Sequence, residues 1–460
     1  MVNFPDTRDS LSHLKIVDLK RLMESSLTNN QYIDGIRAGR LLGETLKAFR
    51  DASRTGKFED PALQAAFDSG SLFKLSLAAA FDLVTNAEYL HGRVVNAKWI
   101  YCHREGEPPK AYYSFLKQCP KCCLDRGLEK RLSGAQHKPA SHHIGEITTV
   151  VCALILELLA TANDEPLSIA TISKQSHDVD AIGYRDDLLV LFEIKASPMV
   201  TYPVVATLPE ALHTDQSGDL EEYSQHSLID MPWVDVDVSL AIPHRSEEIP
   251  LGKRSGVGWP YDPLIDHIRQ PGNFLSYLSA WIELFNAYSV PKTRRSRRAM
   301  ALSYLVNGWG DEIDSNKTKP GLGRTDDIKK GTYQLLKFGA YYRDDDSSIP
   351  VRGALVANLD PLFLRERYID SLADVRWGHS RDFSLVDGEY RIRSNSLKYL
   401  YDAIISFNAP VINDEHMSSV FDFDAVSRAL LDGKLDALLD VWSADGPDAA
   451  VSDADAGKLF

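Results

Sequence analysis

The residues with the clearest chemical potential lie in a predicted β-hairpin. Two β-prone runs, residues 177–184 and 188–195, are joined by a short polar turn, which indicates antiparallel strands. Strand alternation places Glu193 and Lys195 on one face and apolar residues on the other. Hydrophilic side chains at the end of an otherwise apolar strand are costly to bury unless something compensates them. A divalent cation shared by Glu193 and by Asp180, on the neighbouring strand, would do so.

Carboxylate oxygens in this arrangement suit Mg²⁺, which keeps several of its waters. A water whose pKa is lowered by the metal, held by Lys195, becomes a nucleophile, and the ammonium stabilises charge on a phosphate oxygen. The pattern therefore predicts metal-dependent phosphodiesterase chemistry. Asp178, two residues from Asp180 on the same strand face, is an alternative metal ligand. The competing interpretation is an edge hairpin in which Glu193 pairs with Lys195 and faces solvent, since Glu-x-Lys triplets also occur by chance.

The hairpin is flanked by elements that must position it. A long helix with a broad apolar face starts near His143 and ends before the turn at residues 163–166. A further β-prone run covers residues 167–173. Downstream, the spacing of apolar residues predicts a helix over residues 325–343 and a strand over residues 351–358.

In motif and element order the chain resembles the PD-(D/E)XK nuclease superfamily, which includes many type II restriction endonucleases, and it also resembles ApaLI-like restriction enzymes. That family's core is a helix, a three-stranded meander carrying Asp and Glu-x-Lys, a second helix and a further strand. The resemblance covers roughly residues 143–195 and 325–358. It implies that Asp180 and Glu193 bind the metal and that Lys195 is catalytic, although the usual Pro before the Asp is absent.

The resemblance also implies roles on the two helices. Glu146, on the helix before the meander, matches an acidic residue that some members use as a further metal ligand. Its alternative interpretation is an ordinary first-turn Glu favoured by the helix dipole. On the second helix, Gln334 and Lys337 share a face, and such residues in the family often point toward the site or the DNA backbone.

A basic run is a second candidate for DNA contact. It could track phosphates, although similar runs also form solvated loops or helix ends. The predicted DNA-binding residues of this run are Arg294, Arg295, Arg297 and Arg298. Residues 317–324 lack the order of a P-loop, so no nucleotide cofactor is expected.

The cysteines predict a structural Zn²⁺ site. Cys119 and Cys122 have the two-residue gap that lets two thiolates share one tetrahedral ion, and Cys102 is a natural third ligand. The fourth ligand is His137, Cys123 or His103, in that order of preference. All four positions would be filled by protein, so the zinc would stabilise the fold and leave no position for a substrate.

Composition bounds the remaining possibilities. The 460 residues, 44% hydrophobic and 25% charged, are typical of a globular protein with two or three modules, and they exclude disorder, collagen and coiled coil for the bulk of the chain. The net charge of −14 argues against nucleic acid at first sight. Residues 411–460, however, carry eleven acidic and three basic residues, which accounts for −8. No apolar run approaches a membrane span and no signal layout is present, so we expect a soluble, cytoplasmic protein.

We therefore expect an α/β (α+β) fold with a mixed central sheet flanked by helices in a nuclease-like core. The expected regions are a helical region at 1–93, a zinc module at 94–141, a core at 142–195 and 321–410, an insertion at 196–320 that serves DNA recognition, and an acidic segment at 411–460 with a disordered tail from 444.

The sequence favours a Mg²⁺-dependent endonuclease that cuts double-stranded DNA, of the type II restriction class and acting as a homodimer. Within the same chemistry, a repair nuclease, a junction resolvase or an antiphage effector stays open. From another class, the alternative is a non-catalytic, zinc-containing DNA-binding protein. A protein-interaction scaffold with accidental motifs is the third possibility.

Overall fold

The chain folds into two compact units. Unit 1 comprises residues 1–33, 148–196 and 321–429, and unit 2 comprises residues 34–147, 197–320 and 430–460. The computed structural model describes residues 19, 21, 35–93, 98–104, 107–127, 132, 141–172, 179–208, 227–230, 236–254, 258–306, 319–343, 349–379, 382–392 and 397–445.

Unit 1 is built on a six-stranded mixed sheet. Its strands, in spatial order, are β16 (Val411–Ile412), β15 (Ala403–Ser406), β10 (Val351–Ala357), β5 (Leu188–Ile194), β4 (Ala181–Arg185) and β3 (Ser168–Thr171). The three strands β3, β4 and β5 form an antiparallel meander, whereas β10 pairs in parallel with both β5 and β15. Every residue of β5 is buried, which explains its nearly continuous apolar sequence.

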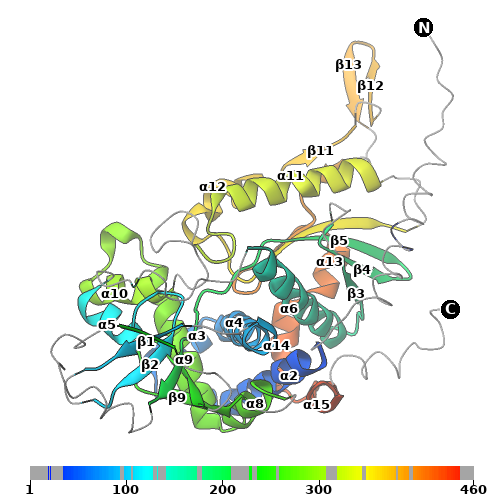
Figure 1. Cartoon of the computed structure of the whole chain (residues 1–460). Helices are drawn as coiled ribbons and strands as arrows, with labels where there is room; N and C mark the ends of the chain where they lie inside the picture. The colour runs from blue at the N-terminus through cyan, green and yellow to red at the C-terminus, as the bar shows by residue number, and fades with distance from the viewer. Residues whose placement is uncertain are drawn as a thin grey trace. The chain divides into compact units, whose positions relative to one another are not determined.

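The helices of unit 1 cover this sheet. They are the second half of α6 (Ser141–Ala162), α11 (Thr325–Tyr342), α12 (Arg365–Tyr368), α13 (Glu415–Val420) and most of α14 (Phe423–Leu431), with short 3₁₀ turns η2 (Leu362–Leu364) and η3 (Asp370–Leu372). Helix α11 packs on β10 and β5 (Figure 1). Its Leu335 and Phe338 share a core cluster with Leu189, Leu191 and Leu355 of those strands.

Helix α6 has the length and composition of a membrane-crossing segment over His143–Ala162. In the structure, 72% of that window is buried inside the protein. A core helix that is apolar on all sides has the same composition, so this finding is weak evidence for a membrane span.

Two small antiparallel pairs stand apart from the main sheet of unit 1. Strands β11 (Arg376–Trp377) and β14 (Lys398–Tyr399) form one, and β12 (Phe383–Val386) and β13 (Glu389–Ile392) form the other. In Figure 1 the β12–β13 hairpin extends outward from the end of α11 near β11.

Unit 2 contains a second six-stranded sheet, which is antiparallel throughout. In spatial order it contains β7 (Ser227–Asp230), β1 (Lys98–Cys102), β2 (Lys110–Tyr113), β6 (Val204–Thr207), β8 (Asp237–Ala241) and β9 (Glu248–Lys253). Strands from residues 98–113 therefore pair with strands from the segment 196–320.

The helices of unit 2 are α2 (Gly35–Ser53), α3 (Pro61–Asp68), α4 (Leu72–Arg93), α5 (Pro120–Arg126), α8 (Tyr261–Ile268), α9 (Pro271–Tyr288), α10 (Arg297–Leu305) and α15 (Asp436–Asp445), with the 3₁₀ turn η1 (Lys292–Arg294). Helix α15 packs on α2, and its Trp442 is buried against Gly43. Arg40 Nε also donates to Ser443 O (3.2 Å), and the helix ends at Asp445, inside the segment predicted to be a disordered tail from about 444.

A buried carboxylate anchors the chain where it enters unit 2 after β5. Asp82 of α4 is fully buried, and its two oxygens accept hydrogen bonds from the backbone N–H of Met199 and Val200 at 2.9–3.1 Å and from Trp281 Nε1 at 2.8 Å. Asn86, one turn further along α4, donates to Val200 O at 3.1 Å. The segment that follows Lys195 is therefore fixed to α4 within a few residues.

The expected fold class is confirmed at its coarser level, because the structure is a mixed α/β fold with mixed sheets. The helix expected at 325–343 and the strands expected at 188–195 and 351–358 match α11, β5 and β10 to within one residue at each end. Apart from residues 19 and 21, the regions 1–34 and 446–460 lie outside the described residues.

The Asp82 anchor predicts a pH dependence. Burial raises the pKa of Asp82 to about 7 from its ordinary 3.8, against the opposing effect of its N–H donors. The folded state therefore holds a proton that the unfolded chain loses, so this group's contribution to stability decreases as pH rises from about 4 to about 7.

The variant Asp82→Asn cannot ionise at this position. We therefore expect the difference in the free energy of unfolding, wild type minus Asp82→Asn, to decrease as the pH rises from about 4 to about 7. Urea unfolding followed by circular dichroism at four pH values measures the difference. A difference that is constant or rises with pH would contradict the assignment.

Candidate functional site

The structure brings Asp180, Glu193 and Lys195 together in unit 1. Asp180 precedes β4 directly, Glu193 lies near the end of β5, and Lys195 follows that strand. Ala181 pairs with Phe192, so continuing this register places Asp180 opposite Glu193 on adjacent strands. Side chains two residues apart share a face, so both carboxylates lie on the face covered by α11.

Backbone hydrogen bonds fix this strand end. Asp180 N donates to Phe192 O (3.1 Å), Asp180 O accepts from Ile172 N (2.9 Å), and Lys195 N donates to Val356 O of β10 (2.8 Å). The Asp180 side chain is held as well, because its Oδ2 accepts a hydrogen bond from Ile194 N at 2.8 Å. The two carboxylates therefore belong to rigid elements of the sheet.

The charges of the trio compensate one another. Asp180 is 8% exposed and Glu193 is 5% exposed. Lys195 Nζ hydrogen-bonds to Glu193 Oε1 and lies 3.8 Å from Asp180 Oδ2. A positive charge therefore lies between two nearly buried carboxylates, in the position where a shared cation would neutralise them.

Helix α11 approaches the trio closely because of a glycine. A Cβ added at Gly331 would come within 2.6 Å of Leu355 Cδ1, and Leu355 is the register partner of Glu193 on β10. Asp327, four residues earlier and therefore on the same helix face, is half-buried and acts electrostatically on Lys195. Its carboxylate also lies 3.4 Å from Arg324 Nε.

Sequence reasoning did not single out Asp327. Its signal was the acidic pair at 326–327, in the first turn of the helix after Glu-x-Lys. Acidic residues there are usually explained by the helix dipole, so only the packing of α11 on β5 shows which of the two faces the site.

The electrostatic balance keeps Lys195 charged. Burial alone would lower the pKa of Lys195, but the attraction of Glu193 and Asp180 outweighs it and raises the pKa above its ordinary value. Burial raises the pKa of Asp327, against the effect of Arg324 and Lys195. At neutral pH Lys195 is therefore an ammonium, a hydrogen-bond donor and no proton acceptor.

The other residues predicted for this site stand as follows. Glu146 is exposed on the part of α6 that belongs to unit 2, and its role as a metal ligand stays a prediction. Asp178 lies outside the described residues. Gln334 and Lys337 are both half-buried on α11, and their contact with DNA also stays a prediction.

The basic cluster of unit 2 divides into two kinds of residue. Arg295 is a structural brace, since its guanidinium donates to Val290 O, Ser303 Oγ and Tyr288 O at 2.8–3.0 Å. Arg298 pairs with Glu283 at 2.6 Å. Arg294 and Arg297 are exposed, and they are the members best placed to contact a polyanion.

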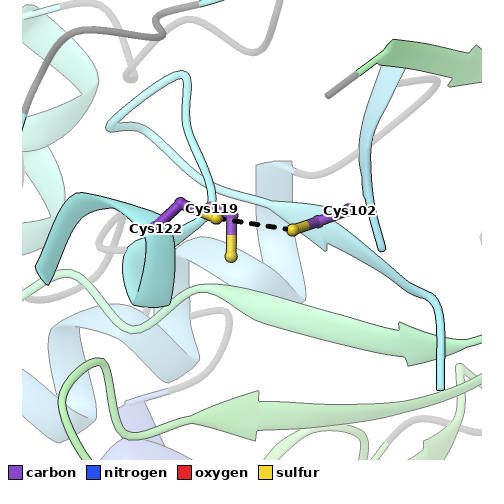
Figure 2. A group of neighbouring side chains, drawn as sticks. All are labelled: Cys102, Cys119 and Cys122. Carbon is purple, nitrogen blue, oxygen red and sulfur yellow. Dashed lines mark hydrogen bonds between the residues drawn. The ribbon is translucent and has the colours of Figure 1, made fainter. Parts of the chain in front are cut away.

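Three cysteines of unit 2 form a buried group that could bind a metal such as zinc. Cys102 ends β1, Cys119 caps the N-terminus of α5, and Cys122 lies in the first turn of that helix. Figure 2 shows the three side chains converging, with all sulfur atoms within 4.8 Å of one another. The Cys102–Cys122 sulfur distance is 3.7 Å, close to the ~3.8 Å that Zn–S bonds of about 2.3 Å give in a tetrahedron.

The surroundings of the group also suit thiolate ligands. Hydrogen bonding from Cys102 lowers the pKa of Cys119, but hydrogen bonding with Cys122 and burial raise it to about 11. A bound cation reverses this by favouring thiolates, and the charge of Arg104 acts on Cys119 and Cys122 in the same direction. Arg104 is itself held by Asp125 (2.9 Å) and Glu107 (3.3 Å).

The fourth ligand stays open. His137, the preferred candidate, lies outside the described residues. Cys123 is buried on α5, and His103 is exposed at the end of β1. Among the described residues, no fourth His, Cys, Asp or Glu joins the three cysteines within the 4.8 Å reach of one ion.

Comparisons of the chain with protein-family models, with curated proteins and with solved structures found no match. A function for this protein is therefore inferred from the geometry of the Asp180, Glu193 and Lys195 trio and of the cysteine group.

The close approach of α11 gives a stability prediction. Gly331→Ala adds a Cβ that collides with buried Leu355, so we expect a loss of about 1–2 kcal/mol even though Ala favours helices by about 1 kcal/mol. Gly272→Ala, in the first turn of α9 with nothing within 4 Å of the added Cβ, is the control and should be neutral or slightly stabilising. The urea unfolding midpoints of Gly331→Ala and Gly272→Ala test this prediction. Equal midpoints of the two variants would contradict the expected destabilisation by Gly331→Ala.

The cysteine group gives a metal prediction. We expect the purified chain to carry about one zinc per molecule and Cys119→Ser to lose it, because replacing one thiolate leaves too few strong ligands. Elemental analysis after gel filtration measures this. Cys152→Ala, which removes a buried cysteine from α6 outside the group, should retain the metal. Metal-free wild type, or equal metal in Cys119→Ser and wild type, would contradict the site.

Proposed function

We propose that this protein is a Mg²⁺-dependent DNA endonuclease of the PD-(D/E)XK type. The observation that carries the proposal is the convergence of Asp180, Glu193 and Lys195 from neighbouring strands onto one face of a buried sheet. Two hard carboxylate ligands beside one ammonium are the donor set that metal-assisted phosphodiester hydrolysis requires.

The order of elements around the trio also supports the proposal. The chain runs α6, β3, β4, β5, then unit 2's long segment, then α11 and β10. The meander β3–β4–β5 is extended by β10 in parallel with β5, and α11 covers the carboxylate-bearing face. This is the sequence of elements expected for the nuclease core that the chain resembles.

Asp180 and Glu193 would hold Mg²⁺ through their carboxylate oxygens. When bound there, Mg²⁺ supplies a Lewis acid that polarises the scissile phosphate and lowers the pKa of a bound water. The residues fit such an ion because their charges are nearly buried and are neutralised in the structure by the ammonium of Lys195. Glu193 Oε1 accepts a hydrogen bond from Lys195 Nζ in the structure, and Lys195 would have to give up that bond for Glu193 to hold the ion.

Lys195 would then face the reacting atoms. As an ammonium it donates hydrogen bonds, so it orients the attacking water and stabilises negative charge on a non-bridging phosphate oxygen. The water oxygen would form the new bond to phosphorus and release one proton to solvent. The P–O3′ bond would break in line, and O3′ would take a proton from solvent and leave as the 3′-hydroxyl. The products are a 5′-phosphate and a 3′-hydroxyl. Asp327 holds the Lys195 charge from the α11 side.

The finer identity that we propose is a restriction-type enzyme acting on double-stranded DNA as a homodimer. Arg294 and Arg297 of unit 2 and Gln334 and Lys337 of unit 1 are proposed to contact phosphates. Such contacts would make binding strongly dependent on salt despite the chain's net charge of −14.

The test is cleavage of phage and plasmid DNA with Mg²⁺ or with EDTA. We expect Mg²⁺-dependent cutting by the wild type and a loss of at least about 10³-fold in Glu193→Gln and in Lys195→Met, since each removes a group that acts on the reacting phosphate. Asp187→Asn, an exposed carboxylate in the turn of the same hairpin, is the matched control and should cut normally.

The pattern of products separates the levels of the proposal. Discrete bands establish a restriction-type enzyme, whereas a smear supports a nuclease and removes the restriction-type identity. Intact DNA with a retained gel shift would contradict catalysis and favour the DNA-binding alternative. Circular dichroism of each variant establishes that it is folded.

A further inference from the structure

The β12–β13 hairpin of unit 1, called the arm from here on, is a two-stranded sheet of its own. Its strands are joined by Asp387 and Gly388, which both have positive φ (54° and 82°), as a tight type I′ turn requires. In Figure 1 the arm extends away from the other labelled elements of the unit. An isolated two-stranded hairpin is at best marginally stable in water.

One face of the arm is apolar and exposed. Phe383 pairs with Ile392 and Leu385 pairs with Tyr390, so these four side chains form two adjacent cross-strand pairs on one face. Their exposed fractions are 37% for Phe383, 65% for Leu385, 78% for Tyr390 and 47% for Ile392. Together they expose roughly 400 Å², which is the size of apolar patch that is often functional on a monomer.

Strands β11 and β14, which flank the arm in the chain, are firmly attached within unit 1. Trp377 of β11 packs against Gly339 of α11, where an added Cβ would come within 2.6 Å of the indole. The same indole donates to Tyr399 O of β14 at 3.1 Å, and the guanidinium of Arg376 lies 4.0 Å from the centre of the Tyr399 ring. The β11–β14 pair, which flanks the arm in the chain, is therefore fixed against α11.

We propose that this apolar face is a contact surface for a second copy of this chain. An isologous contact uses the same patch on both copies, and a flat apolar ladder can pack on its own two-fold mate as two sheets do. Nucleic acid fits less well, because the tip carries Asp387 and Glu389 against the single cation Arg391 among the described residues of the arm.

The area of the patch sets the strength of the contact. Burying roughly 400 Å² on each copy is about half of the ~800 Å² per partner of a standard stable interface. The arm alone therefore supports a weak dimer whose population depends on concentration. This proposal deepens the proposed function, because it rests on the homodimer named there and assigns it a contact surface. It does not depend on the nuclease chemistry, and a dimer would place two candidate cleavage sites in one particle.

The experiment is sedimentation equilibrium of the full chain from about 1 to about 100 µM. Wild type is compared with Leu385→Ser/Tyr390→Ser, which removes the apolar face, and with Val386→Ser/Arg391→Ser, which changes the opposite face of the same strands. We expect the weight-average mass of the wild type and the control to rise toward the dimer, and the dissociation constant of the first variant to increase at least about tenfold.

Two outcomes would overturn the proposal. One is a wild type that stays monomeric over the whole concentration range. If, in addition, the Leu385→Ser/Tyr390→Ser variant binds DNA more weakly than the wild type, the apolar face serves nucleic acid and the proposal is overturned in the same way. The other is equal self-association of all three proteins. Leu385, Tyr390 and Arg391 are exposed and Val386 is half-buried, so equal thermal unfolding midpoints are measured to establish that the fold is intact.

Discussion

The candidate active site depends on the cost of holding two carboxylates inside an apolar sheet. Asp180 and Glu193 are almost fully buried, and the other residues of β5 are all hydrophobic. Their charges are tolerated because the N–H of Ile194 and the ammonium of Lys195 contact them. We propose that this site takes a divalent cation, because the protein supplies two fixed carboxylates beside one ammonium.

Local sequence signals were enough to predict the hairpin. Alternation of apolar residues, a polar turn at 185–187 and the Glu-x-Lys triplet place Glu193 and Asp180 on adjacent strands, and the structure has them there. The helix over 325–343 was equally readable from its spacing. The cysteine spacing gave the three buried sulfurs, because a two-residue gap and a nearby strand end are local features.

Features that depend on long-range pairing were not predictable in this way. The sheet of unit 2 joins strands separated by about a hundred residues, so no local pattern reveals that residues 98–113 and 204–253 form one layer. Asp82 reads as an ordinary helix residue until its contacts with Met199 and Val200 are seen. Asp327 gains its place only from the packing of α11, and the arm's exposed face only from its lack of a neighbouring strand among the described residues.

The central claim is that Asp180 and Glu193 form one metal site, and anomalous diffraction from crystals soaked in Mn²⁺ tests it most directly. Mn²⁺ prefers the same oxygen ligands as Mg²⁺ and can be located by its own signal. We expect an anomalous peak about 2 Å from a carboxylate oxygen of Asp180 and from one of Glu193, with Lys195 Nζ displaced from Glu193 Oε1. No peak at this position, with Lys195 still hydrogen-bonded to Glu193, would contradict it.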